Sequence, residues 1–120
     1  MERGGGGRFT DSEVQAYKQD VKNIMIRMGL LSGEEVHTVQ QKNVTRAENL
    51  EAETDGLWYP VFSAGDTFAG GAVLGTVRDI WGNLLREYRA DYPGIVLYQT
   101  VGLGVKTGDP LIAYGEYVDR

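Results

Sequence analysis

The residue types that most often carry metal or nucleophilic chemistry are scarce in this chain. Cysteine is absent and His37 is the single histidine, so neither a disulfide nor a thiolate metal site can form. A zinc site held by one chain usually needs several His or Cys ligands, and we therefore expect none within these residues. A lone histidine is more often a surface or hydrogen-bonded residue than a ligand, so no role is assigned to His37.

One carboxylate has unusual neighbours. Glu2 precedes Arg3 and four consecutive glycines, residues 4–7. A carboxylate can act as a general base when an activated water lies within hydrogen-bond reach, although a solvated side chain on a frayed terminus is the simpler interpretation of the spacing alone. The glycines could cradle a phosphate ahead of a helix. Because neither a Gly-Lys-Ser/Thr ending nor a Gly-x-Gly-x-x-Gly register accompanies them, a flexible or tightly turning loop is predicted instead.

Composition narrows the class of protein. The chain has 120 residues, enough for one domain with a modest core. Its net charge of -5 argues against nucleic acid as a partner, because phosphate binding needs clustered Lys and Arg. No apolar run approaches the ~20 residues that span a bilayer, and the first residues lack the apolar segment of a signal peptide. We expect a soluble, cytoplasmic protein without membrane contacts.

The N-terminal part predicts one helix, from Asp11 to Met28. Thr10 and Glu13 have the spacing of a capping box, and Gly29 is the residue type that commonly follows a helix end. Apolar residues recur along this segment at spacings of three and four and form a single stripe: Val14, Tyr17, Val21, Ile24, Met25 and Met28. The stripe needs a cover, which is either the sheet of this chain, an absent neighbouring domain or a dimer partner.

The rest of the chain predicts a connector and then strands. Residues 32–54 are polar and are interpreted as a connector with one or two weak strands. Beyond Asp55, five segments are rich in β-branched and aromatic residues and are predicted to be strands: 57–62, 72–78, 84–89, 95–99 and 111–117. Trp81-Gly82-Asn83 is predicted to form a hairpin turn between two of them. Since hairpin tips are normally polar, we expect Trp81 to pack back onto the sheet.

Two stretches of the strand region repeat each other. Phe68–Leu74 aligns with Val105–Leu111, and both read apolar, two spacers, Gly, two spacers, Leu. Upstream, Gly56–Tyr59 aligns with Gly94–Leu97. A unit with one apolar face that is used twice must close on its copy. The sequence therefore predicts a mainly β protein: an N-terminal helix followed by a small sandwich of two short sheets with an internal pseudo-two-fold repeat.

Three runs of residues carry a family resemblance. The first is Asp55-Gly56-Leu57-Trp58-Tyr59-Pro60 with Gly65-Asp66, Gly71, Leu74-Gly75, Val77-Arg78-Asp79 and Gly82. The second is Gly94-Ile95-Val96-Leu97 with Val105-Lys106-Thr107-Gly108-Asp109-Pro110-Leu111. The third is Glu2-Arg3 with the four glycines, followed by a helix and Met28-Gly29-Leu30-Leu31. Together they resemble the C-terminal domain of the succinylglutamate desuccinylase/aspartoacylase family, deacylases related to zinc carboxypeptidases. Lipoyl and biotinyl domains share the glycine pattern of the second half, so a barrel-sandwich module of lipoyl/biotinyl type is expected there.

The resemblance implies a parent enzyme larger than this chain. Residues 1–31 would be the tail of its catalytic domain, residues 32–54 a connector and residues 55–120 the lipoyl-like β-sandwich domain. In this family one zinc is held by two His and a Glu, which would lie upstream, so zinc would belong to the full-length parent and none would be bound by this fragment. Glu2 matches the position of the family's general acid/base.

Two classes of function follow. The first is a non-catalytic C-terminal fragment of a zinc-dependent amidohydrolase, or deacylase, acting on an N-acyl amino acid or similar small acyl amide. Its partners would be the missing N-terminal catalytic domain, the small-molecule substrate of the parent and, in a homo-oligomer, further copies. The fragment would shape the active-site entrance or the oligomer, with the Trp81 hairpin leaning on the catalytic domain near that entrance.

The second class is a lipoyl/biotinyl-like binding or carrier module without enzymatic activity. Carrier domains present their lysine on the hairpin between the two half-repeats. That stretch is residues 78–83 here, and it contains no lysine. Lys106 falls inside the second half-repeat and is interpreted as a surface lysine. A standalone structural or dimerisation domain is a third alternative.

Overall fold

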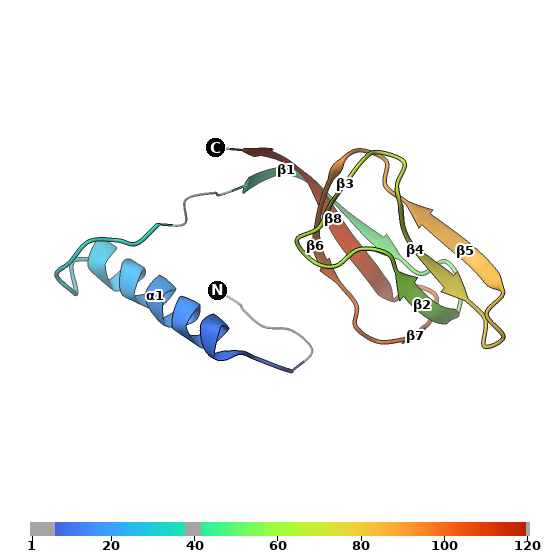
Figure 1. Ribbon diagram of the computed structural model, residues 1–120, viewed down its shortest axis with the longest axis horizontal. Coiled ribbons are helices and arrows are strands. Elements are labelled where there is room, and N and C mark those ends of the chain that lie inside the picture. Colours follow the sequence, from blue (N-terminus) through green and yellow to red (C-terminus); the bar gives the residue numbers. More distant parts are fainter. Residues whose placement is uncertain (1–6, 38–41, 120) are drawn as a thin grey trace. The chain divides into compact units, whose positions relative to one another are not determined.

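The chain is divided into two compact units, residues 1–39 and 40–120. The computed structural model describes residues 7–37 and 42–119. The described part of the first unit contains one helix, and that of the second contains two four-stranded antiparallel sheets (Figure 1). The fold is therefore mainly β, as predicted. Among the described residues, no helix combines the length and the apolar character needed to cross a membrane.

Helix α1 spans Asp11–Arg27. The N–H of Glu13 donates to Thr10 Oγ1 at 3.3 Å, and the N–H of Thr10 donates to the Glu13 carboxylate at 2.6 Å, which confirms the predicted capping box. At the other end Met28 is the cap and Gly29 has a φ of 73°, a conformation that costs glycine little. The predicted helix is thus confirmed to within one residue.

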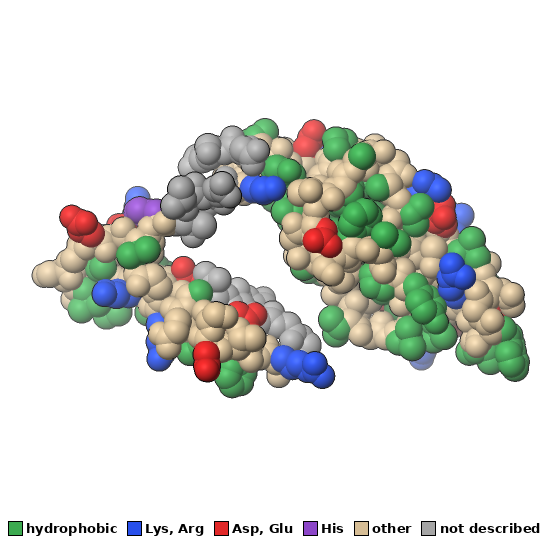
Figure 2. Space-filling view, in the orientation of Figure 1, with side chains coloured by type: hydrophobic (Ala, Val, Ile, Leu, Met, Phe, Trp, Pro, Cys, Tyr) green, Lys and Arg blue, Asp and Glu red, His purple; other side chains and the backbone are tan. Residues whose placement is uncertain are grey.

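The apolar stripe of α1 is exposed or half-buried along its length. No residue of α1 is buried, and Tyr17, Val21 and Ile24 are between 39% and 49% exposed. Figure 2 shows hydrophobic side chains on the surface of this unit. A cover for this stripe therefore stays a prediction.

The described part of the second unit contains eight strands. They are β1 (Lys42–Glu51), β2 (Gly56–Pro60), β3 (Thr67–Phe68), β4 (Val73–Arg78), β5 (Leu84–Arg89), β6 (Gly94–Gln99), β7 (Gly104–Val105) and β8 (Pro110–Asp119). One sheet has the order β1-β8-β6-β3 and the other β5-β4-β2-β7, so the two share no strand. The five strands predicted from residue type correspond to β2, β4, β5, β6 and β8, and β5 agrees at both ends.

Strand β1 differs from its prediction. It lies in the segment interpreted as a connector with weak strands, yet it is ten residues long. It pairs with β8 from Lys42 opposite Asp119 to Glu51 opposite Pro110. Most of its side chains are exposed, so little apolar alternation marks it in the sequence. Its backbone pairing with β8, rather than its own burial, makes it a strand.

The core is built from both sheets. Trp58 and Tyr114 are its largest fully buried side chains. Trp58 meets Tyr88 edge to face with ring centroids 5.7 Å apart, and Tyr114 meets Phe68 in the same way at 5.6 Å, an arrangement that aromatic pairs favour. The buried cluster lies wholly between Ala52 and Tyr114 in the sequence, so the second unit supplies all of it.

Two turns at corresponding positions of the aligned stretches have the same geometry. Gly71 and Gly108 both have positive φ, 79° and 89°. The N–H of Gly71 donates to Ala90 O and the N–H of Gly108 donates to Ala52 O, each at 2.8 Å. Each glycine is followed three residues later by a leucine with no exposed surface. In both turns the glycine with positive φ thus bonds to the residue that directly follows a distant strand, which is Ala90 after β5 and Ala52 after β1.

Candidate functional site

The predicted general acid/base, Glu2, lies outside the described residues, and so do the first three glycines of the cluster, residues 4–6. Gly7 is described and has a φ of 71°, which glycine adopts readily. The catalytic role assigned to Glu2 therefore stays a prediction.

A metal ion does not fit the described part of the chain. In residues 7–37 and 42–119, no three His, Cys, Asp or Glu side chains gather closely enough to hold one. Several aspartates instead accept hydrogen bonds from backbone amides in turns. They are Asp55 from Thr107, Asp66 from Ser63 and Asp109 from Lys106, each at 2.8 Å. These carboxylates organise loops, and no step through a metal is derived from them.

Lys106 lies in the turn between β7 and β8. Its N–H donates to the Asp109 carboxylate at 2.8 Å, and the N–H of Asp109 donates back to Lys106 O at 2.9 Å. The residue is exposed, as expected for a surface lysine. The β4–β5 hairpin, the place of the attachment lysine in carrier domains, is joined by residues 79–83, none of which is a lysine.

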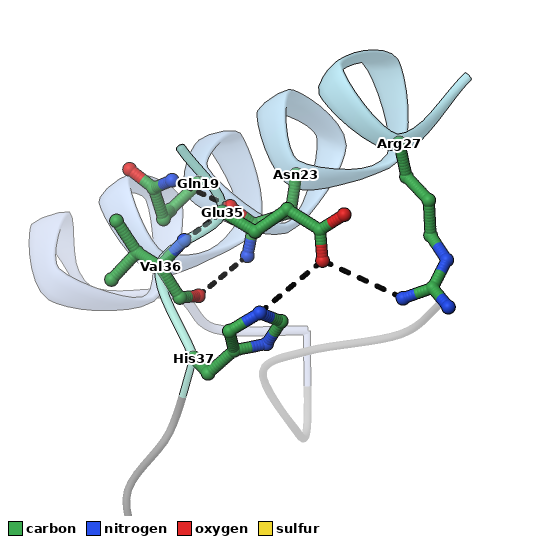
Figure 3. A network of polar contacts seen from close by, with 6 residues as sticks. All are labelled: Gln19, Asn23, Arg27, Glu35, Val36 and His37. Atoms are coloured by element: carbon green, nitrogen blue, oxygen red, sulfur yellow. Dashed lines mark hydrogen bonds and ion pairs between the residues drawn. The ribbon is translucent and has the colours of Figure 1, made fainter. Parts of the chain in front are cut away.

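A polar network holds the segment after α1 against the helix (Figure 3). The Asn23 side chain makes two bonds with the backbone of Val36: Nδ2 donates to Val36 O at 2.6 Å, and Oδ1 accepts from Val36 N–H at 3.0 Å. Gln19 Nε2 also donates to Asn23 Oδ1 at 2.9 Å. The Asn23 side chain thus satisfies both backbone polar groups of Val36.

The same network gives His37 its partner. Glu35 lies 3.3 Å from His37 Nε2 and 3.5 Å from the Arg27 guanidinium, and both partners are more than 70% exposed. Exposed ion pairs contribute little to stability. We interpret His37 as a surface residue of this network.

The β4–β5 hairpin carries the best-organised turn. Asp79 Oδ1 accepts hydrogen bonds from the N–H groups of Trp81 and Asn83, both at 2.8 Å, and Oδ2 accepts from Asn83 Nδ2 at 2.8 Å. Arg78 adds a bond from Nη1 to Gly82 O at 3.0 Å. Three of these four bonds thus converge on one carboxylate. An Asp that accepts from the backbone two residues on is typical of turns.

Trp81 is 82% exposed and Ile80 is 76% exposed. The expectation that Trp81 packs back onto the sheet is therefore wrong. The physical reason is local: Asp79 binds the N–H of Trp81 itself and fixes it in a turn beyond the strand ends, while Trp58 already fills the core beneath the sheet. The residue pattern drew attention to Trp81, whereas the signal for this turn was Asp79, an aspartate at the start of a turn.

The hydrogen bonds of this turn favour the ionised form of Asp79. The Asn83 side chain lowers the pKa of the Asp79 carboxyl most, backbone amides of the turn lower it further, and desolvation raises it in part. A carboxylate that accepts several hydrogen bonds is stabilised in its charged form. The Asp79 carboxylate is therefore charged at neutral pH, the form that accepts these bonds.

An open cavity of about 600 Å³ lies at the other sheet. It is lined by Thr67, Phe68, Ala69, Pro93, Gly94, Glu116 and Tyr117. Ligand sites normally enclose most of a ligand and converge a few polar groups on it. This cavity is open, and Glu116 is its charged member, so we assign it no reaction.

No protein-family model and no curated protein matches the chain. Solved structures do match it. The ectoine utilization protein EutE (DoeB) from Ruegeria pomeroyi is 30% identical in its apo structure, with a TM-score of 0.80 over 94% of this chain and 37% of its own. Its product-bound structure gives 29% identity and a TM-score of 0.81.

Proteins described by the predicted family name share the fold. A succinylglutamate desuccinylase from Silicibacter sp. TM1040 is 24% identical, with a TM-score of 0.82 over 96% of this chain and 36% of its own. The resemblance predicted from the sequence is thus confirmed over nearly the whole chain. The chain spans a little more than a third of the length of these proteins.

Proposed function

We propose that this chain, which resembles the succinylglutamate desuccinylase/aspartoacylase family, is the C-terminal part of a deacylase that hydrolyses an amide bond. One observation carries the proposal: the match runs through both units, covers 94–96% of this chain and yet covers only 36–37% of the matched proteins. A binding module that merely shared the β fold would not explain a match that includes the first unit.

In this proposal the chain does not hold the catalytic metal. The described residues lack a metal-binding group, so a zinc ion would be held by residues of the N-terminal catalytic domain, outside this chain. Glu2 would be the general acid/base of the full-length enzyme, moving a proton between water and the leaving amine. The β unit would shape the active-site entrance or an oligomer, and a cytoplasmic location is expected.

The proposed substrate is an N-acyl amino acid or a similar small acyl amide. The Ruegeria pomeroyi protein is described as an ectoine utilization protein, and a role in ectoine utilization is a narrower candidate to test. The residues that choose the acyl group would belong to the N-terminal domain.

We further propose that the β unit is a lipoyl-like barrel-sandwich with a pseudo-two-fold repeat. Exchanging β2 with β6, β3 with β7, β4 with β8 and β5 with β1 converts one strand order into the other, and the matched turns at Gly71 and Gly108 support the same relation. A lipoyl-like fold is also compatible with the alternative function, that of a carrier module. Mass spectrometry of protein from its native host tests it, because lipoate or biotin on Lys106 would contradict the deacylase proposal.

The decisive experiment begins with the reading frame upstream of Met1. The full-length protein that it encodes should hydrolyse N-acyl amino acids, whereas the 120-residue chain should not. Replacing Glu2 with Gln in the full-length protein should lower kcat by roughly 10²–10⁴-fold, the usual contribution of general acid-base catalysis, with an unchanged thermal unfolding midpoint. Full activity of the Glu2→Gln variant would exclude this residue from the reaction.

A further inference from the structure

The end of the β4–β5 hairpin presents an apolar patch. We name Ile80, Trp81 and Leu84 the hairpin patch; they are 76%, 82% and 55% exposed. Figure 2 shows hydrophobic side chains at this end of the β unit. Trp is the residue type most enriched among those that dominate binding energy at interfaces, and an exposed Trp at a turn is a poor choice for a surface that meets only water.

The patch is held rigidly before any partner arrives. Asp79 fixes the backbone of Trp81 and Asn83 through three bonds of 2.8 Å, and Arg78 ties the turn to Gly82 at 3.0 Å. Ordering a loop on binding costs conformational entropy, and a preformed loop avoids most of that cost. The turn therefore fixes the backbone of Trp81 in advance, which lowers the entropy cost of using this residue as a binding anchor.

We propose that the hairpin patch docks onto the part of the full-length polypeptide that precedes this chain. The proposal rests on the proposed function, which supplies that N-terminal domain. The length of chain outside this sequence supports it, because the matched proteins continue over nearly two-thirds of their length beyond the region that this chain covers.

The size of the patch favours this occupant over a second copy. A stable interface between separate proteins buries roughly 800 Å² on each partner, whereas a docked aromatic side chain buries only about 150–250 Å². Three side chains at a narrow tip fall short of the first figure. A covalently linked domain needs less area, because the linker holds it at an effective concentration of roughly millimolar. The receiving surface should offer an apolar pocket and an acceptor for the indole N–H of Trp81.

Iodide quenching of tryptophan fluorescence tests the docking. The 120-residue chain has two tryptophans, of which Trp58 is 2% exposed and Trp81 is 82% exposed, so half of them should be open to quenching. In the full-length protein, the signal of Trp81 is isolated as the difference between the wild type and the Trp81→Phe variant. We expect this signal to lose its quenching. A Trp81 that stays fully quenched in the full-length protein overturns the proposal.

A matched pair of variants gives a second readout. Trp81→Ser should lower the thermal midpoint of the full-length protein and leave that of the 120-residue chain unchanged. Val101→Ser is the control, since Val101 is 81% exposed but lies outside the hairpin, and it should change neither. Equal effects of Trp81→Ser on both proteins, or protection of Trp81 that disappears on dilution, would contradict docking within one polypeptide.

These outcomes are separate from the proposed activity. A protected Trp81 in a protein without deacylase activity supports the docking and removes the proposed function. An exposed Trp81 in an active deacylase removes the docking and supports the proposed function.

Discussion

At the scale of single residues, the absence of a side chain matters as much as its presence. Gly75 on β4 faces the indole of Trp58, and a Cβ added there would overlap the ring. A Cβ added at Gly94 would likewise overlap the carbonyl oxygen of Gly115. Glycine inside a strand often marks such a close approach, so these positions fix the distance between neighbouring parts of the β unit.

Gly75→Ala should therefore destabilise the protein by about 1–3 kcal/mol, the usual cost of overpacking a core. Gly104→Ala is the matched control: it also lies in a strand, but nothing lies within 4 Å of a Cβ added there, so its free energy of unfolding should change by less than about 0.5 kcal/mol. Urea denaturation followed by intrinsic tryptophan fluorescence measures both. Similar losses in the two variants would contradict this account of Gly75.

The sequence predicted the elements of this chain better than the positions of its side chains. The exposure of Trp81 was not predictable from residue type, because apolar side chains at turns usually find cover. The outcome was decided by Asp79. Its residue type and place favour a turn, but the three bonds that it makes there are seen only in the structure.

At the scale of elements, the β4–β5 turn depends on the charge of Asp79. Its pKa is held below the ordinary value of 3.8, chiefly by the Asn83 side chain. A lowered folded-state pKa means that the stabilisation is present above the unfolded pKa and is lost as the pH falls through the folded pKa. The turn should therefore stay intact at neutral pH and loosen only below pH 3.8.

Amide chemical shifts of Trp81 and Asn83, recorded by NMR from neutral to strongly acid pH, measure this loss. Both should titrate together with a midpoint below 3.8, since both N–H groups donate to Asp79 Oδ1. Asp79→Asn removes the titrating group and should abolish the shared transition. A midpoint at or above 3.8 would contradict the proposed cause.

Elements were predictable where their own residues carried the signal, whether or not those residues are buried. The amphipathic α1 carried its own start and end signals, and β5 kept its predicted bounds. The two-residue strands β3 and β7 are too short to show any periodicity. Strand β1 was not predicted as a long strand because its ten residues are mostly exposed and show little apolar alternation. It forms a strand because its backbone pairs with β8.

At the scale of the whole molecule, the second unit holds a complete core. Among the described residues, every member of the buried core cluster lies between Ala52 and Tyr114. A chain of residues 40–120 should thus fold alone, with a free energy of unfolding within about 0.5 kcal/mol of the full 120-residue chain. Urea denaturation with intrinsic tryptophan fluorescence compares the two. A clear loss of stability on removing residues 1–39 would show that α1 supports the β unit.

The pairing of β1 with β8 has a mechanical consequence. Lys42 lies opposite Asp119, so the chain enters and leaves the β unit side by side. Tension applied before Lys42 and after Asp119 would peel the two strands apart one rung at a time, because antiparallel rungs lie perpendicular to the strands and would be loaded in sequence rather than together. The unit should yield to low force at these ends while its aromatic interior is still assembled.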